Sequence, residues 1–248
     1  MPKFFTAREN ISDHEIKIDN EDVAHITRVL RLKCGDLITV CDGRGYDYAA
    51  RIERIEPKEI YCSVQSKQKC NTESNIAVTL FQGIPKASKM DYIIQKTTEL
   101  GIVRIVPVAL ERCVVRLENK KAEEKKRDRW QKIAGEAAKQ SGRGVIPEVT
   151  LPMSLEDALQ MAKQMDLCFV PYECEEQKHL KEVLTAKPEV QTVGFMIGPE
   201  GGFDPAETEK IKAAGIETVT LGRRILRTET AGEAVLAMIM YELGDING

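Results

Sequence analysis

Two glycine-containing segments near the C-terminus carry residue types that could bind a ligand and act on it. The first reads Ile197-Gly-Pro-Glu-Gly-Gly-Phe203, and the second reads Leu221-Gly-Arg-Arg-Ile-Leu-Arg-Thr-Glu-Thr-Ala231. Successive glycines tolerate positive φ and let backbone N–H groups approach a ligand closely. The first segment adds a carboxylate and the second adds three arginines, so together they could hold a ligand and stabilise a developing negative charge.

Each segment is predicted to join a strand to a helix. An apolar run at residues 193–197 precedes the first segment, and Asp204, Pro205 and Glu207 after it are typical of a capped helix start. The second segment follows a short stretch at 217–220 and leads into the final helix. Ligands bind outside the carboxyl ends of strands in an open α/β sheet, so we expect the two loops to form one site.

Neither segment matches a nucleotide-binding fingerprint, because there is no Gly-Lys-Ser/Thr and no Gly-x-Gly-x-x-Gly. Taken alone, the first is also explained as a tight turn without function, and the second as a solvated basic turn. Arg223, Arg224 and Arg227 cannot share one face of a regular helix. We therefore expect a folded loop whose arginines point in different directions, with Thr228 or Thr230 capping the final helix.

Two more loops are predicted at the same edge of the sheet. A strand that ends in Phe169-Val-Pro-Tyr-Glu173 brings a third loop there. The loop at 82–89 carries Lys86 and Lys89 at the start of a helix. Positive charge at a helix N-terminus opposes the helix dipole, so we expect an anion nearby, and RNA phosphate would fit.

Residues 1–72 are predicted to form a small β-rich domain. Alternating or β-branched residues predict strands at 3–6, 15–18, 37–41, 46–55 and 59–64. One helix interrupts them, with Asn20 as its N-cap. One face of this helix is expected to contain Val23, Ile26, Val29 and Leu30. Five short strands and one helix favour a small barrel, and the polar residues 66–75 are interpreted as a linker.

Residues 73–248 are predicted to form an α/β domain, because strands and helices alternate there. Strands are predicted at 76–81, 103–110, 167–171, 193–197 and 217–220, and a brief extended piece is predicted at 147–151. Helices are predicted at 88–100, 120–140, 154–164 and 177–184. One more helix is predicted to begin at 204, and a final helix to end at about 243. This alternation favours a parallel sheet with helices on both faces. The many charges of both signs at 120–132 are explained as a solvated helix surface.

Composition narrows the possible functions. The net charge is −3, so a protein that coats nucleic acid through its overall charge is excluded, and any RNA-binding charge must gather on one face. The seven cysteines form no Cys-x-x-Cys pair and the three histidines are far apart, which argues against a zinc site or a disulfide framework. No apolar stretch approaches a membrane span and no signal peptide is recognised, so cytoplasm is expected.

Gly198–Phe203 followed by the Leu221–Ala231 motif resembles the SPOUT (α/β-knot) RNA methyltransferases. Within this class, the motifs resemble the branch that methylates N3 of a uridine in 16S rRNA of the small ribosomal subunit. It implies a PUA-like RNA-binding barrel, a C-terminal parallel α/β domain with a deep trefoil knot, S-adenosylmethionine (SAM) as cofactor, and no metal. It also implies a homodimer, with the last helix at the interface, although an intramolecular core would equally explain that apolar helix.

The resemblance implies roles for particular residues. Arg227 is expected to stabilise the uridine anion, while Glu200 and Glu229 are weaker candidates for the proton acceptor. The expected cofactor-binding residues are Val170, Pro171, Tyr172, Ile197, Gly198, Pro199, Glu200, Gly201, Gly202, Leu221, Gly222, Ile225, Leu226 and Thr230. The expected RNA-binding residues are Arg8, Arg28, Arg31, Lys86, Lys89, Arg112, Gln140 and Arg143.

Three points stay open in the sequence. Arg112 could pair with Glu99 at the edge of the sheet, in a functional or a purely structural role. A sister SPOUT enzyme that acts on another nucleotide or atom would share the same motifs. A non-enzymatic RNA-binding ribosome assembly factor is a further alternative, although the intact Gly198, Gly222 and Arg227 argue against it.

Overall fold

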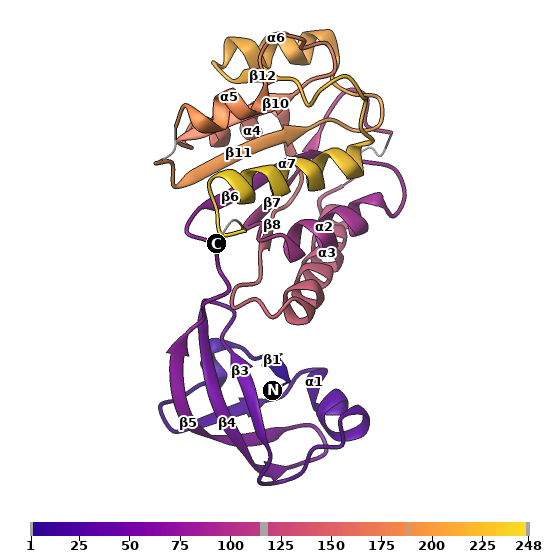
Figure 1. Cartoon of the computed structure of the whole chain (residues 1–248). Helices are drawn as coiled ribbons and strands as arrows, with labels where there is room; N and C mark the ends of the chain where they lie inside the picture. The colour runs from indigo at the N-terminus through magenta and orange to yellow at the C-terminus, as the bar shows by residue number, and fades with distance from the viewer. Residues whose placement is uncertain (1, 115–118, 188, 247–248) are drawn as a thin grey trace. The chain divides into compact units, whose positions relative to one another are not determined.

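The computed structural model describes residues 2–114, 119–187 and 189–246, which form two compact units (Figure 1). The first unit contains Met1–Glu73 and Ala138–Ile146, and the second contains Ser74–Ala137 and Pro147–Gly248. The return of 138–146 to the first unit was not anticipated from the sequence. Within the residues described, no helix is long and apolar enough to cross a membrane.

The first unit is a curled five-stranded sheet with the order β1-β3-β4-β5-β2. Its strands are β1 (Lys3–Phe5), β2 (Glu15–Ile18), β3 (Leu37–Cys41), β4 (Tyr46–Ile55) and β5 (Ile60–Lys69). β1 pairs with β3 in parallel, and the other pairs are antiparallel. The five predicted strands are confirmed. β5 continues to Lys69, however, so the linker predicted from residue 66 is partly strand.

The predicted helix of the first unit is irregular. A short α1 (Asp22–Ala24) passes into a π-helical turn η2 (His25–Val29), in which the Leu30 N–H donates to the His25 carbonyl at 3.0 Å. The wider turn moves later side chains off the face that buries Val23 and Ile26. Val29 is 68% exposed and Leu30 is 38% exposed, so they do not share the face of buried Val23 and Ile26, and the prediction of one common face is wrong.

Residues 138–146 are tied to the first unit by polar contacts. The Glu73 carboxylate accepts hydrogen bonds from the Arg143 guanidinium at 2.6 Å and from the Gly144 N–H at 2.8 Å. Lys139 pairs with Asp22 at 2.7 Å. Buried charges are retained in proteins when they are paired and hydrogen-bonded in this way.

The second unit is built on a parallel sheet with the order β12-β10-β11-β6-β7-β8, and β9 also pairs with β7. Its strands are β6 (Ala77–Gly83), β7 (Arg104–Ala109), β8 (Glu148–Val149), β9 (Met153–Ser154), β10 (Leu167–Pro171), β11 (Thr192–Ile197) and β12 (Glu217–Val219). All of their pairings are parallel, as predicted. Only β9 had no counterpart among the predicted elements.

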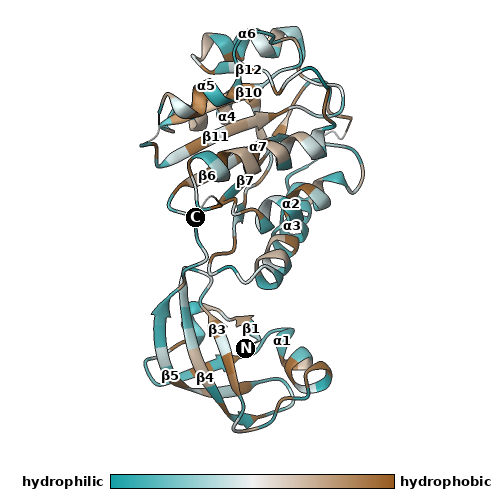
Figure 2. Ribbon diagram, in the orientation of Figure 1, coloured by the Kyte–Doolittle hydropathy of each residue, from teal (hydrophilic) through white to brown (hydrophobic). Residues whose placement is uncertain are grey.

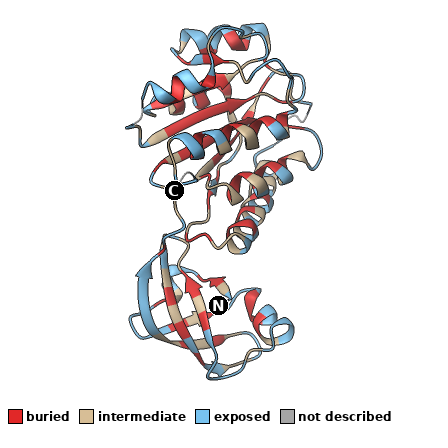
Figure 3. Ribbon diagram, viewed as in Figure 1, coloured by how far each residue is buried: buried red, intermediate tan, exposed pale blue. Residues whose placement is uncertain are grey.

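Helices cover both faces of this sheet. They are α2 (Lys89–Glu99), α3 (Lys120–Gln140), α4 (Leu155–Ala162), α5 (Leu180–Thr185), α6 (Pro205–Ala213) and α7 (Thr228–Glu242). Phe81 and Met196 pack into a core cluster with residues of α4 and α6. Their neighbours on the strands face the opposite way, where α7 crosses β6 and β11. Figures 2 and 3 show these central strands as apolar and buried.

The capping signals read from the sequence are present at two helices. Asp204 accepts from the Ala206 N–H at 3.0 Å, and Glu207 accepts from the Asp204 N–H at 2.8 Å, which completes the predicted capping box of α6. Ser154 accepts from the Asp157 N–H at the start of α4. Such caps satisfy backbone donors that have no partner within the helix.

Candidate functional site

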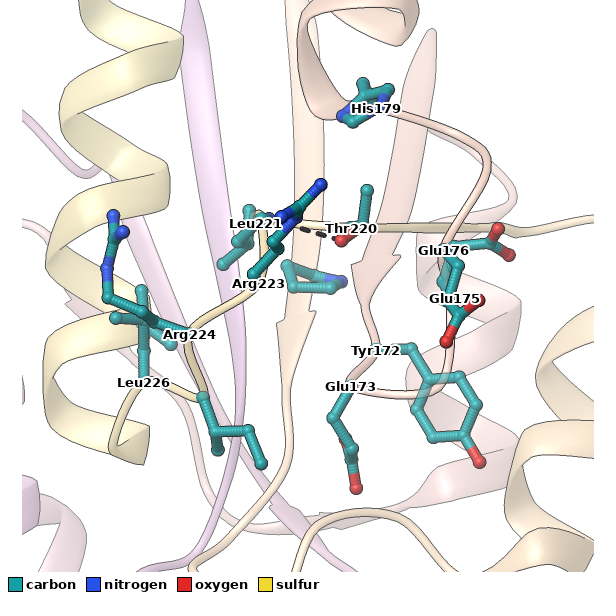
Figure 4. A pocket seen from close by; sticks show the side chains of 14 residues that line it. Tyr172, Glu173, Glu175, Glu176, His179, Thr220, Leu221, Arg223, Arg224 and Leu226 are labelled. Atoms are coloured by element: carbon teal, nitrogen blue, oxygen red, sulfur yellow. Dashed lines mark hydrogen bonds between the residues drawn. The ribbon is translucent and has the colours of Figure 1, made fainter.

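Loops after β10, β11 and β12 surround two adjoining pockets at the carboxyl ends of these strands. One pocket of about 660 Å³ lies between the loop after β10 and residues 220–226 (Figure 4). The other, of about 460 Å³, is lined by the loop after β11 and the start of α7. Both pockets are lined by Pro171, Glu173, Ile225, Leu226 and Ala231, so they form one continuous site.

Most of the residues expected to bind a cofactor line these pockets. They are Pro171, Tyr172, Ile197, Gly198, Pro199, Glu200, Gly201, Gly202, Leu221, Gly222, Ile225 and Leu226. Val170 and Thr230 are not among the lining residues. The Val170 side chain lies in the core between the sheet and α4, and Thr230 is exposed on α7.

The glycine loop after β11 is closely packed, and one of its glycines has a positive φ. Gly202 has φ +67°, and a Cβ there would lie 2.7 Å from Glu173 Oε1. At Gly198 a Cβ would lie 3.2 Å from the Gly202 backbone. Gly83 at the end of β6 supports the loop, because a Cβ there would come within 2.8 Å of the Pro199 nitrogen. The loop therefore presents backbone groups to the pocket, as the glycine pattern indicated.

Thr228 connects three elements of the site. Its hydroxyl donates to the Gly198 carbonyl at 2.7 Å and accepts from Gln82 Nε2 at 2.9 Å. The N-cap residue of α7 is Arg227, which makes no side-chain capping bond, so the prediction that Thr228 or Thr230 caps this helix is wrong. The Thr228 hydroxyl instead joins β6, the glycine loop and α7.

The two candidate proton acceptors share one lysine. Lys89 Nζ lies 3.2 Å from a carboxylate oxygen of Glu200 and 3.2 Å from one of Glu229. Glu200 also accepts from the Lys86 N–H at 3.1 Å. The anion expected near the start of α2 is therefore supplied by the chain itself.

These contacts keep both carboxyls ionised. Burial opposes ionisation of Glu200, but its own N–H, the Lys86 N–H and Lys89 together hold its pKa below the usual value. Burial likewise opposes ionisation of Glu229, and its own N–H, Lys89 and the charge of Arg227 lower its pKa. A general base works best with a pKa near the working pH, so both are weak proton acceptors.

The arginines of the second motif surround the site from different sides. Arg223 and Arg224 line the larger pocket and point in different directions, as predicted (Figure 4). Arg227 is exposed and lines the smaller pocket, beside the glycine loop and Lys89. Its position at the junction of the loop and α7 suits a charge that acts on a bound substrate.

The residues expected to bind RNA have different surroundings. Arg8, Arg28 and Arg31 are exposed on the first unit, although Arg31 follows the π-helical turn with φ 54° and does not share a helix face with Arg28. Lys86 is exposed, and Gln140 is exposed at the end of α3. These side chains are available for phosphate contacts.

Arg112 and Arg143 both make bonds within the protein, but only Arg112 is exposed. Arg112 donates to the Gly201 carbonyl at 2.9 Å and pairs with Asp204 at 3.4 Å. Glu99 pairs with Lys96, so the suggested pair between Glu99 and Arg112 is wrong. Arg143 is 3% exposed, and its guanidinium is bonded to Glu73. We therefore remove Arg143 from the RNA-binding set, because its guanidinium is neither accessible nor unpaired.

Several residues of the site were not singled out from the sequence. Glu173 lines both pockets, and fully buried Gln82 positions Thr228. Glu175 accepts hydrogen bonds from the Gln177 N–H at 3.0 Å and the Thr218 hydroxyl at 2.8 Å, which lower its pKa to about 2. The contact between Gln82 and Thr228 could have been suspected from one sequence feature, which is a polar residue at the end of a buried strand.

The site can be compared with known proteins. A family model described as an RNA methyltransferase domain matches residues 72–240, and one described as an RNA methyltransferase PUA domain matches residues 18–65. A Bacillus subtilis protein named ribosomal RNA small subunit methyltransferase E is 37% identical over 236 residues, which is 93% of this chain and 91% of that protein. The chain belongs to this RNA methyltransferase family.

Solved structures of relatives agree with the family. A Neisseria gonorrhoeae ribosomal RNA small subunit methyltransferase E, solved with bound SAM, is 32% identical with a TM-score of 0.87 and covers 99% of both chains. A Legionella pneumophila protein solved with bound SAM is 30% identical with a TM-score of 0.89 and the same coverage. The expected RNA methyltransferase family, α/β class and PUA domain are confirmed.

Proposed function

We propose that this protein transfers a methyl group from SAM to N3 of a uridine in 16S rRNA of the small ribosomal subunit. The observation that carries the proposal is the continuous site formed by the three loops after β10, β11 and β12, which contains both sequence motifs. The names of the Bacillus and Neisseria relatives, and the SAM bound to the latter, support the substrate and the cofactor.

The residues of the site fit SAM. Ile225 is 85% exposed, and together with Leu221 and Leu226 it offers an apolar surface that an adenine ring would cover. The glycine loop offers close backbone groups. The Glu173 carboxylate lies where the two pockets meet and suits an ammonium or ribose hydroxyl groups. When bound, SAM supplies an electrophilic methyl group on its sulfonium.

The protein must position the uridine and favour its anion. N3 carries a proton that has to leave, and a fixed positive charge beside the base lowers the cost of this step. We assign this role to Arg227, which lines the smaller pocket. Glu200 and Glu229 fit better as groups that fix Lys89 and the glycine loop than as proton acceptors. N3 pairs within a helix, so the target base must be unpaired or flipped.

The larger assembly is also part of the proposal. Residues 1–72 and 73–248 would act as an RNA-binding and a catalytic domain, with Arg8, Arg28 and Arg31 on the former. By resemblance to the family, we infer a trefoil knot, a cytoplasmic homodimer and no catalytic metal. One face of α7 is buried within its own unit, whereas Met238 and Tyr241 are 40% and 61% exposed. That exposed face is our candidate for the dimer contact.

The test is to incubate the protein with methyl-labelled SAM and unmodified small ribosomal subunits, and then to digest the RNA. We expect the label in 3-methyluridine. Label in another nucleoside would move the protein to a sister activity. No label in RNA, with SAM binding confirmed by calorimetry, would favour the non-enzymatic assembly factor.

A further inference from the structure

The ends of β4 and β5 present a basic and aromatic surface on the first unit. Tyr46 pairs with Lys69, and Tyr48 pairs with Lys67, in the antiparallel register of the two strands. The last five residues of β5 are all exposed, and Figures 2 and 3 show this strand as largely hydrophilic and exposed. Tyr46 is 41% exposed, and Arg44 just before it is also exposed.

Lys67 is held in place by the tyrosine rings. Its Nζ lies 4.5 Å from the centroid of the Tyr46 ring and 5.5 Å from that of Tyr48. A cation–π contact fixes an ammonium without neutralising its charge. Lys67 and Lys69 are two residues apart on one strand, so they lie on the same face about 6.7 Å apart along it. Consecutive phosphates of an extended nucleic acid strand can contact such a pair.

The carboxylates near this surface already have partners. Asp47, which follows Tyr46, pairs with Lys3 at 2.9 Å. Asp42 accepts from the N–H groups of Arg44 and Tyr46, at 2.8 and 3.1 Å. Glu73 is bonded to the Arg143 guanidinium. Asp47 and Glu73 are therefore neutralised by cationic partners, whereas Asp42 keeps its charge, because backbone N–H groups carry none. The three cations Arg44, Lys67 and Lys69 outnumber this one carboxylate, and an anionic partner would balance the remaining charge.

The exposed Tyr46 ring indicates which class of nucleic acid would bind this surface. Ordinary solvation would explain isolated surface lysines, but it does not explain an exposed tyrosine ring held against one of them at the end of an extended strand pair. Proteins that bind single-stranded nucleic acid combine a positive groove with aromatic rings on which bases stack. A duplex hides its base faces within the stack, so an open ring favours unpaired nucleotides.

We propose that Arg44, Tyr46, Lys67 and Lys69 form a contact surface for a single-stranded segment of the substrate RNA. A base would stack on Tyr46, and phosphates would contact the three cations. This proposal rests on the proposed function, because that function supplies the RNA. It adds a surface on β4 and β5 to the Arg8, Arg28 and Arg31 set, which lies on other elements.

The test measures RNA affinity of the whole protein against KCl concentration by fluorescence anisotropy. The probes are an oligouridine strand and a blunt RNA duplex with the same number of phosphates. The variants are Lys67→Gln with Lys69→Gln, and Tyr46→Leu. The matched control is Lys181→Gln with Lys212→Gln, two exposed lysines of the second unit, which changes the net charge by the same amount.

We expect the lysine pair to reduce the slope of log affinity against log salt by about 1.4 for the single strand, since each lost phosphate contact contributes about 0.7. Tyr46→Leu should weaken single-strand binding on the order of tenfold and leave duplex binding unchanged. Equal affinities and slopes for the lysine variant and its control would overturn the proposal. The comparison of the Lys67→Gln, Lys69→Gln variant with its control tests the proposed surface even if Tyr46→Leu destabilises the fold.

Methyl transfer by the wild type is measured in parallel, so that the two proposals can fail separately. Wild-type protein that transfers no methyl group, but whose RNA affinity depends on Lys67 and Lys69, would reject the proposed function and support this surface. Active wild type whose RNA affinity is the same in all variants would reject this surface and leave the proposed function intact.

Discussion

Lys89 organises the charged residues of the candidate site. Its ammonium lies 3.2 Å from a carboxylate oxygen of Glu200 and 3.2 Å from one of Glu229. Both contacts raise the pKa of Lys89, and the contact with Glu229 has the larger effect. The sequence indicated a cation that needed an anion at this helix start, and it identified both carboxylates. It could not show that they satisfy each other, because that depends on how β6, β11 and α7 are placed in the sheet.

Replacing Lys89 with Met should loosen the glycine loop. Glu200 would lose its cation while keeping the Lys86 N–H, and SAM affinity should fall on the order of tenfold. Lys86→Met is the matched control, since the contact seen for Lys86 uses its backbone N–H. Titration calorimetry measures both affinities, and equal values for the two variants would contradict this role.

Replacing Arg227 with Ala should slow methyl transfer without weakening SAM binding. We expect SAM affinity close to that of the wild type, and a single-turnover rate lower by about 100-fold or more, because a fixed charge that stabilises a developing anion is lost. Quench-flow with saturating RNA measures the rate. An unchanged rate would remove Arg227 from the proposed mechanism.

At the scale of elements, local signals predicted most of the fold. The strands, the parallel sheet and the capping box at Asp204 follow from alternation and from residue types at helix ends. The π-helical turn at His25–Val29 was missed because periodicity reasoning assumes 3.6 residues per turn. Thr228 was misassigned because a threonine at a helix start usually caps it, whereas here tertiary packing directs its hydroxyl to Gly198.

Thr228→Val should destabilise the second unit by about 1–3 kcal/mol, because it leaves the half-buried Gly198 carbonyl and the buried Gln82 amide without their shared partner. Thr230→Val, exposed on the same helix, is the control and should change stability by less than about 0.5 kcal/mol. Urea denaturation measures both variants. Similar losses of stability would show that the hydroxyl bridge adds nothing.

Glu175 gives a prediction with a defined pH window. Hydrogen bonds from the Gln177 N–H, the Thr218 hydroxyl and the Lys178 N–H lower its pKa from 4.5 to about 2. A lowered folded-state pKa contributes stability that is present above pH 4.5 and lost as the pH falls toward 2. The carboxyl carbon shift in NMR should titrate near the lower value, and Thr218→Val should raise it. Titration near 4.5 in the wild type would contradict these contacts.

At the scale of the whole molecule, two features lay beyond the sequence. Residues 138–146 belong to the first unit through the pair of Arg143 with Glu73, which are 70 positions apart. No local pattern reports a contact over that separation, so Arg143 was interpreted as RNA-binding. The buried face of α7 was likewise ambiguous, because an apolar helix suits a core and an interface equally.

The proposed dimer can be tested on the exposed face of α7. Met238→Glu combined with Tyr241→Glu places two charges where the two-fold contact is proposed, and desolvating them would be costly. We expect sedimentation velocity at micromolar concentration to show a dimer for the wild type and a monomer for the variant. A monomeric wild type would count against the dimer.

We propose that the loops after β10, β11 and β12 form one cofactor site. A crystal structure of the protein with S-adenosylhomocysteine tests this most directly. We expect the adenine to lie against Leu221, Ile225 and Leu226, and the rest of the ligand to extend past Glu173 toward the glycine loop. A ligand bound at any other surface, with these loops empty at saturation, would contradict it.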